Sequence, residues 1–274
     1  MILTALAVGA LIGLVVGALG AGGGILSVPA LIYLLGVAPH EATSASLVIV
    51  LFTALAALGG RIGKNTICYQ IALVFAALAT VGTWLGSLAN QAVSSDLLMY
   101  AFALLLACVG LVMLRRAYVS SNDGAAAADD ADGTGSTPAL GAVSAMGEVT
   151  SIGAVPLWRV ALVATITGAL TGFFGVGGGF AIVPALTLVL HLPIKRAAST
   201  SLLIMTITAV VALVARAQTS LNLDLGVIGA FTVASMLGSV AGAPLTRKVS
   251  SQKLTASFAA LLLAVAVATL VGQS

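Results

Sequence analysis

Residues 17–31 read GALGAGGGILSVPAL, and residues 172–186 read GFFGVGGGFAIVPAL. The two stretches align without a gap, and each places three consecutive glycines ahead of a Val-Pro pair. Because glycine gains backbone freedom outside a helix, we expect the helical path to break at both triplets. The pair predicts that one structural unit occurs twice in this chain.

The alignment continues beyond the glycines. It pairs Arg61 with Arg216, and later the Leu-Gly-Ser of residues 85–87 with the Leu-Gly-Ser of residues 237–239. The hydroxyl residues Ser44 and Ser46 align with Ser199 and Ser201. An ordered series of this length indicates an internal duplication, which is a common plan among secondary transporters.

Composition places the chain in a membrane. Of its 274 residues, 60% are hydrophobic and only 7% are charged, with a mean hydropathy of +1.19. Soluble domains carry about 25% charged residues, so lipid is the solvent that fits this chain. The few basic residues are scattered between apolar runs, which argues against a nucleic-acid partner. The two cysteines are interpreted as packing residues, because no metal-ligand or disulfide spacing is present.

Ten apolar runs predict the membrane segments. They fall at about 2–19, 25–37, 42–60, 67–89, 97–114, 157–174, 180–192, 197–215, 226–243 and 253–271. Eight approach the roughly 20 residues that a helix needs to cross a bilayer. The runs at 25–37 and 180–192 are short, since 13 helical residues rise only about 20 Å. We therefore expect each of these runs to form a short helix after its glycine triplet.

A polar stretch divides the two halves. It begins VSSNDGAAAADDADGTGST at Val119 and shows no apolar periodicity. The composition predicts a disordered acidic linker over 119–156, on the cytoplasmic side. It joins a first membrane repeat, 1–118, to a second, 157–274.

Charge distribution predicts how the halves face. With five crossings per half and the linker inside, ten of the eleven Lys and Arg residues lie inside and only Arg216 lies outside. With four crossings per half, six of the Lys and Arg residues lie inside and five lie outside. The sequence thus predicts an all-α polytopic membrane protein of two inverted repeats, each with about five membrane segments, and both termini outside.

The glycine breaks are the first candidate site. The amides of a helix that starts inside a cavity are free and carry partial positive charge, so the helix start attracts an anion. The candidates are Gly22, Gly23, Gly24, Gly177, Gly178 and Gly179, with Ser27 one turn further on. The alternative is that these glycines only let helices pack closely.

Side chains near the breaks form the second candidate set. Ser44, Ser46, Ser199, Thr200 and Ser201 open long apolar runs. They either cap helices or form helix-helix contacts, and they can also donate to a substrate anion. A guanidinium suits oxyanions, and we expect Arg216 to attract substrate, whereas Arg61 is interpreted chiefly as a residue that snorkels to the interface. Gln70 and Trp84 are weaker candidates within the fourth run.

Two histidines, His40 and His191, follow the short runs, and we expect both at the membrane interface rather than in proton coupling. No Asp or Glu lies firmly within a predicted span.

The doubled glycine and Val-Pro motif resembles that of the TauE/SafE sulfite exporter family of membrane permeases. The resemblance also includes Ala-Thr-Ser-Ala-Ser-Leu at 42–47 and Ala-Ser-Thr-Ser-Leu at 198–202, and it covers nearly the whole chain outside the linker. It implies a multi-pass protein of a bacterial-type cytoplasmic membrane that moves small sulfur-containing anions such as sulfite, sulfoacetate or other organosulfonates. Members are commonly predicted with about eight spans, whereas ten are expected here.

Two other functions stay open: an anion channel of the same architecture, and a carrier for a different small carboxylate or oxyanion. An enzyme is not expected, because the sequence contains neither a His-Glu-x-x-His motif nor a Ser/His pair within the membrane. The expected partners are a small anionic substrate and the lipid bilayer, with no cofactor and no metal.

Overall fold

The computed structural model describes residues 2–19, 24–61, 67–129, 157–216, 225–242 and 251–271. Within these ranges the chain is all-helical, which confirms the predicted fold class of a polytopic α-helical membrane protein. The first half contains α1 (Ile2–Leu19), α2 (Gly24–Tyr33), α3 (Pro39–Gly59), α4 (Tyr69–Gln91) and α5 (Ser95–Asp129). The second contains α7 (Leu157–Phe174), α8 (Gly179–Leu188), α9 (Ile194–Arg216), α10 (Leu225–Gly242) and α12 (Ser251–Val271).

Helix lengths follow the apolar runs. Four of the described helical segments are long and apolar enough to cross a membrane: Pro39–Gly59, Tyr69–Gln91, Ser95–Arg115 and Ile194–Arg216. The two short runs form α2 and α8, with 10 residues each. Such a helix rises about 15 Å, half of a hydrocarbon core of about 30 Å.

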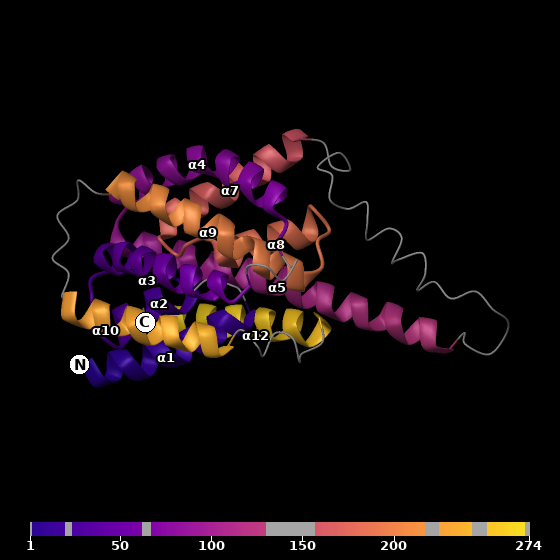
Figure 1. The fold of residues 1–274 in the computed structure, drawn as a ribbon, viewed down its shortest axis with the longest axis horizontal. Coiled ribbons are helices and arrows are strands. Elements are labelled where there is room, and N and C mark those ends of the chain that lie inside the picture. The colour runs from indigo at the N-terminus through magenta and orange to yellow at the C-terminus, as the bar shows by residue number, and fades with distance from the viewer. Residues whose placement is uncertain are drawn as a thin grey trace.

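The halves interlock instead of packing side by side. Helix α1 packs along α10 of the other half, and α4 packs along α7. Helices α3 and α9 meet in the middle, and α5 pairs with α12 (Figure 1). Exchanging the two halves leaves this set of pairs unchanged, so the fold has the internal symmetry that the duplicated sequence predicts.

Glycines allow the closest of these crossings. A Cβ on Gly13 of α1 would overlap the carbonyl oxygen of Ser235, and a Cβ on Gly168 of α7 would overlap that of Ala79. Helix backbones approach this closely only where side chains are absent, as in small-residue contacts of membrane helices.

The predicted break is present between α7 and α8. Gly175, Gly177 and Gly178 have φ angles of +65°, +69° and +69°, a left-handed region that glycine adopts without strain. This stretch lies against α3, where a Cβ on Gly175 would overlap Thr43 and one on Gly177 would overlap Val50. The counterpart in the first half, residues 20–23, lies outside the described residues.

Both short helices end in the same way. Gly36 and His191 occupy equivalent positions with φ angles of +67° and 53°. The next residue then turns back, so that the Val37 amide donates to Leu31 O and the Leu192 amide to Leu186 O, each at 3.0 Å. A left-handed residue closes a helix end in this manner.

Helix α5 continues beyond the predicted end of the first repeat. It runs to Asp129 and projects from the bundle in Figure 1. The remainder of the predicted linker, 130–156, lies outside the described residues.

Candidate functional site

Two arginines form side-chain hydrogen bonds between the two halves. Arg61, just after α3, donates from Nη1 to Ser199 Oγ at 2.9 Å and from Nη2 to Gly17 O at 2.7 Å. Arg61 is only 7% exposed, so its interpretation as a snorkelling residue is wrong. The guanidinium turns into the protein, where it finds polar partners.

Arg216, the last residue of α9, repeats this arrangement. Its Nη1 donates to Thr43 Oγ1 at 2.9 Å and to Ser44 Oγ at 3.1 Å, and its Nη2 donates to Gly172 O at 2.5 Å. The residue is 2% exposed. Each arginine therefore connects two helices. Arg61 links the end of α1 to the start of α9, and Arg216 links the end of α7 to the start of α3.

These reciprocal contacts show how the central helices α3 and α9 are oriented relative to each other. The end of α3 meets the start of α9 through Arg61 and Ser199, and the end of α9 meets the start of α3 through Arg216 and Ser44. Helices α3 and α9 therefore run antiparallel, although they are equivalent in the two repeats.

The arginines also provide hydrogen-bond donors for the ends of α1 and α7, the helices that precede the glycine breaks. Gly17 lies in the last turn of α1 and Gly172 in the last turn of α7. Carbonyls in a last turn lack intrahelical partners and carry partial negative charge. A guanidinium satisfies both needs, which gives each arginine a structural role.

The hydroxyls at the helix starts bond within their own helices. Thr43 and Ser44 donate to His40 O at 2.8 and 3.1 Å, and Ser199 donates to Lys195 O at 3.1 Å. Helix α3 begins after Ala38, which makes no side-chain cap. The capping interpretation is therefore wrong for α3, and the oxygens of these hydroxyls accept from the arginines instead.

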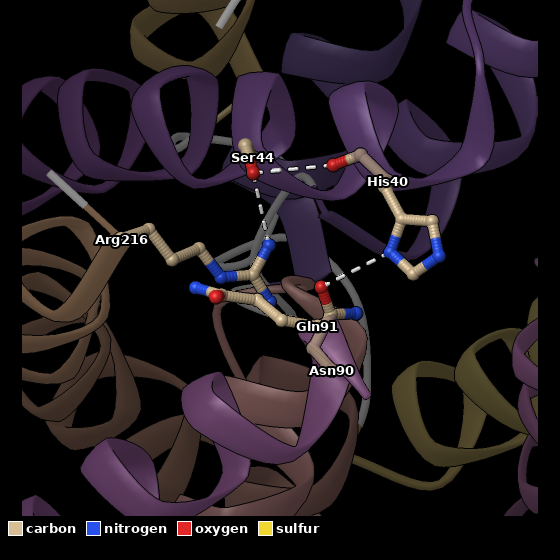
Figure 2. A pocket seen from close by; sticks show the side chains of 5 residues that line it. All are labelled: His40, Ser44, Asn90, Gln91 and Arg216. Carbon is tan, nitrogen blue, oxygen red and sulfur yellow. Dashed lines mark hydrogen bonds between the residues drawn. The ribbon is translucent and has the colours of Figure 1, made fainter. Parts of the chain in front are cut away.

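A pocket opens at Arg216 (Figure 2). It has a volume of about 210 Å³ and is lined by His40, Ser44, Asn90, Gln91 and Arg216. Nδ2 of Asn90 donates to Phe173 O at 2.6 Å, and Oδ1 of Asn90 lies 3.4 Å from Nδ1 of His40. Arg216 Nε is buried and has no hydrogen-bond partner among the described residues. The pocket lining therefore combines amide and imidazole groups with a buried cation whose Nε has no partner among the described residues.

Only some of the predicted site residues line the pocket. Ser44 and Arg216 line it, whereas Gln70 and Trp84 are exposed on other parts of α4. Ser27 is buried within α2. Gly22 and Gly23 lie outside the described residues.

The remaining candidates contact protein. Ser46 donates to Thr43 O and Gly175 O, Thr200 Oγ1 accepts from the Cys68 amide, and Ser201 donates to Ala198 O. A Cβ on Gly178 would overlap Thr171 Oγ1. Gly179 begins α8.

The two breaks approach each other where the short helices begin. A Cβ on Gly24, the first residue of α2, would overlap the Val176 backbone in the second glycine stretch. Backbone atoms of Val176 occupy this contact, and Asn90 of the pocket donates to Phe173 O in the last turn of α7.

Sequence reasoning missed Asn90 and Gln91. They end α4, where a polar residue is unremarkable as the last turn of a membrane helix. The signal that selected Gln70 was a polar side chain within an apolar run, and it did not reach Asn90, which lies one residue beyond the predicted run 67–89 although it is only 3% exposed. Within the described ranges, no three His, Cys, Asp or Glu side chains gather as metal ligands would.

Comparison with known proteins agrees with this architecture. No solved structure matches the chain. A "Probable membrane transporter protein" of Xylella fastidiosa (strain 9a5c) is 33% identical over 262 residues, covering 94% of this chain and 91% of the relative. A protein of the same description from X. fastidiosa (strain Temecula1 / ATCC 700964) is 36% identical over 196 residues, covering 71% and 66%.

A more distant relative is "Probable membrane transporter protein YunE" of Bacillus subtilis (strain 168), which is 27% identical over 209 residues and covers 72% of this chain and 71% of its own. The sequence model of the family described as "Sulfite exporter TauE/SafE" matches residues 5–269. The chain is a membrane transporter, and it belongs to the TauE/SafE sulfite exporter family.

Proposed function

We propose that this transporter carries a small sulfur-containing anion, such as sulfite, sulfoacetate or another organosulfonate, across a bacterial cytoplasmic membrane by alternating access. The family description names sulfite export, and the bacterial relatives compared above are described as probable membrane transporter proteins. The substrate leaves chemically unchanged, so the protein works as a carrier and not as an enzyme.

The burial of Arg216 is the observation that carries the proposal. Its guanidinium is held by two hydroxyls and a carbonyl, and no carboxylate partners it among the described residues. A buried charge with neutral partners is costly in a membrane protein, and such residues mark substrate paths. An anion at Arg216 would compensate this charge.

The antiparallel central helices supply the means of alternation. If α3 and α9 both cross the bilayer, the axis that relates the repeats lies in the membrane plane, and the repeats are inverted. A movement that opens one repeat to one side then has an equivalent that opens the other repeat to the opposite side. In this proposal the repeats are 1–118 and 157–274, and the linker 119–156 faces the cytoplasm.

Reconstitution of the full chain tests the proposal. Proteoliposomes are loaded with unlabelled sulfite or sulfoacetate, and entry of the labelled anion is followed with time. We expect saturable uptake that is accelerated by anion on the opposite side, and mass spectrometry should recover the anion unaltered. Continuous conductance without such acceleration would indicate an anion channel. Movement of another solute, with neither sulfite nor sulfonate carried, would overturn the substrate class.

A further inference from the structure

The guanidinium of Arg216 is only partly used by the protein. Nη1 and Nη2 donate to Thr43, Ser44 and Gly172, whereas Nε is buried and has no partner in the described part of the chain. A buried donor without an acceptor is unfavourable, and unsatisfied groups of this kind mark places where a ligand or an unseen group binds. Nε belongs to a residue that lines the pocket.

The groups opposite Arg216 are held in fixed orientations. Phe173 O, one residue from the carbonyl that accepts from Arg216, accepts from Nδ2 of Asn90. The amide oxygen of Asn90 is thereby turned toward Nδ1 of His40. Gln91 projects into the same pocket from the end of α4, and Figure 2 shows its amide beside the Arg216 guanidinium.

The second repeat lacks these groups. In the repeat alignment, His40 corresponds to Lys195, Asn90 to Gly242 and Gln91 to Ala243. The positions of the second repeat that align with the amide pair therefore carry no side-chain amide. Among the described residues, this polar lining belongs to one side of the pseudo-symmetric molecule.

We propose that the pocket formed by His40, Ser44, Asn90, Gln91 and Arg216 is an anion subsite selective for a monoanionic sulfonate with a small organic group. The sulfonate head accepts from Nε of Arg216 and from the Gln91 amide, while Nη1 and Nη2 keep their contacts with the protein. This inference rests on the proposed function and narrows its substrate class to organosulfonates with one negative charge, which leaves out sulfoacetate because that anion carries two.

Charge and size set the selectivity. Arg216 is the permanent charge on the lining, so one negative charge on the ligand is compensated, whereas a second would remain partly desolvated without a partner. The cavity of about 210 Å³ exceeds the space for one water but falls below the roughly 300 Å³ at which pockets for drug-sized ligands begin. A sulfonate offers three oxygens and a carboxylate two, so a sulfonate can bond Nε and Gln91 together and still reach a further donor.

Binding of ethanesulfonate to the purified full chain tests the assignment. Propionate carries the same ethyl group on a carboxylate, and sulfate carries two charges. Calorimetric titration should rank ethanesulfonate above both. In Gln91→Glu, which alters an exposed side chain, the added carboxylate should weaken ethanesulfonate binding by about tenfold or more, since hydrogen bonds to charged groups contribute about 1.5–3 kcal/mol.

Two matched variants control for general effects. Ala92→Glu places the same charge on the next residue, which is exposed and does not line the pocket, and should change affinity by less than about twofold because exposed charges are screened. Arg216→Lys keeps the charge but loses Nε, and should weaken binding by about tenfold or more. Arg159→Lys, at an exposed arginine stacked on Trp158, should leave affinity unchanged.

Each outcome decides the question. Equal effects of Gln91→Glu and Ala92→Glu, or no effect of Gln91→Glu while the wild-type protein binds and transports sulfonate, would overturn the subsite and leave the proposed function standing. Preference for propionate or sulfate would overturn the sulfonate selectivity. Absence of any sulfite or sulfonate binding and transport by the wild-type protein would overturn both proposals.

Discussion

The surroundings of Arg61 and Arg216 show how two copies of one unit diverge. Both guanidiniums bond a glycine carbonyl at the end of a broken helix and a hydroxyl at the start of the opposite central helix. In the described part of the chain, Arg216 in addition lines a pocket together with His40, Asn90 and Gln91. The backbone contacts of the arginine are thus common to both halves, and the difference lies in the side chains that end α4 and begin α3.

The largest expected effect tests whether the halves are equivalent as scaffolds. Gly13→Leu and Gly168→Leu should each reduce folding stability by at least about 3 kcal/mol, because the new side chain meets the backbone of the partner helix, which cannot rotate away. Thermal denaturation in detergent, followed by size-exclusion chromatography, measures this. Gly229→Leu is the control, since a Cβ there meets open space. A melting temperature of Gly13→Leu equal to that of Gly229→Leu would contradict the close crossing.

The second prediction separates the two arginines. Arg61→Met and Arg216→Met should each lower stability by about 1–3 kcal/mol, because a helix-end carbonyl and a hydroxyl lose a charged donor. Sulfonate transport per folded molecule should fall to background only in Arg216→Met. Proteoliposome uptake, normalised to folded protein, decides this. Equal loss of transport in both variants would show that the two arginines have not diverged in function.

A third, smaller effect concerns the hydroxyl partners. Arg216 donates to both Thr43 and Ser44, whereas in the described part of the chain Nη1 of Arg61 donates to the hydroxyl of Ser199. Ser199→Ala should therefore cost about 1 kcal/mol of stability, and Ser44→Ala clearly less, because Thr43 still accepts. Parallel unfolding curves of the two variants provide the comparison. A greater loss in Ser44→Ala would reverse this interpretation of the contacts.

The smallest expected effect lies where the short helices end. His191→Gly should stabilise the protein by about 0.5–1 kcal/mol, and Gly36→Ala should destabilise it by about 1 kcal/mol, since both positions have left-handed backbone. A Cβ on Gly36 meets no atom within 4 Å, so only conformational strain is added there. Changes of the same sign in both variants would show that side-chain contacts, not backbone angles, dominate at these ends.

The sequence was sufficient for the features that repeat locally. The glycine triplets predicted a helix break, and Gly177 and Gly178 have the positive φ angles that explain it. The length of the apolar runs predicted the short helices α2 and α8. Each of these properties depends on residues that are neighbours in the chain.

Contacts between the two halves could not be predicted from the sequence. Arg61 appeared to be a loop residue because its partners, Gly17 and Ser199, are distant in the chain and are brought together only by the antiparallel packing of α3 and α9. Asn90 and Gln91 align with a glycine and an alanine in the other repeat, so the duplication gave no reason to select them. Residues that recur in both repeats identify the scaffold that the halves share. Side chains present in one repeat alone, such as Asn90 and Gln91, do not stand out in this way.

The interlocked pairing of helices has a consequence for biosynthesis. Helix α1 packs chiefly along α10, and α4 along α7, so each of these helices of the first half emerges from the ribosome before its main partner has been made. Arg61 likewise waits for Ser199, which is synthesised 138 residues later. The sequence repeat is therefore not a folding unit: the first half stays unfinished within the membrane until the second is inserted, and the two mature together.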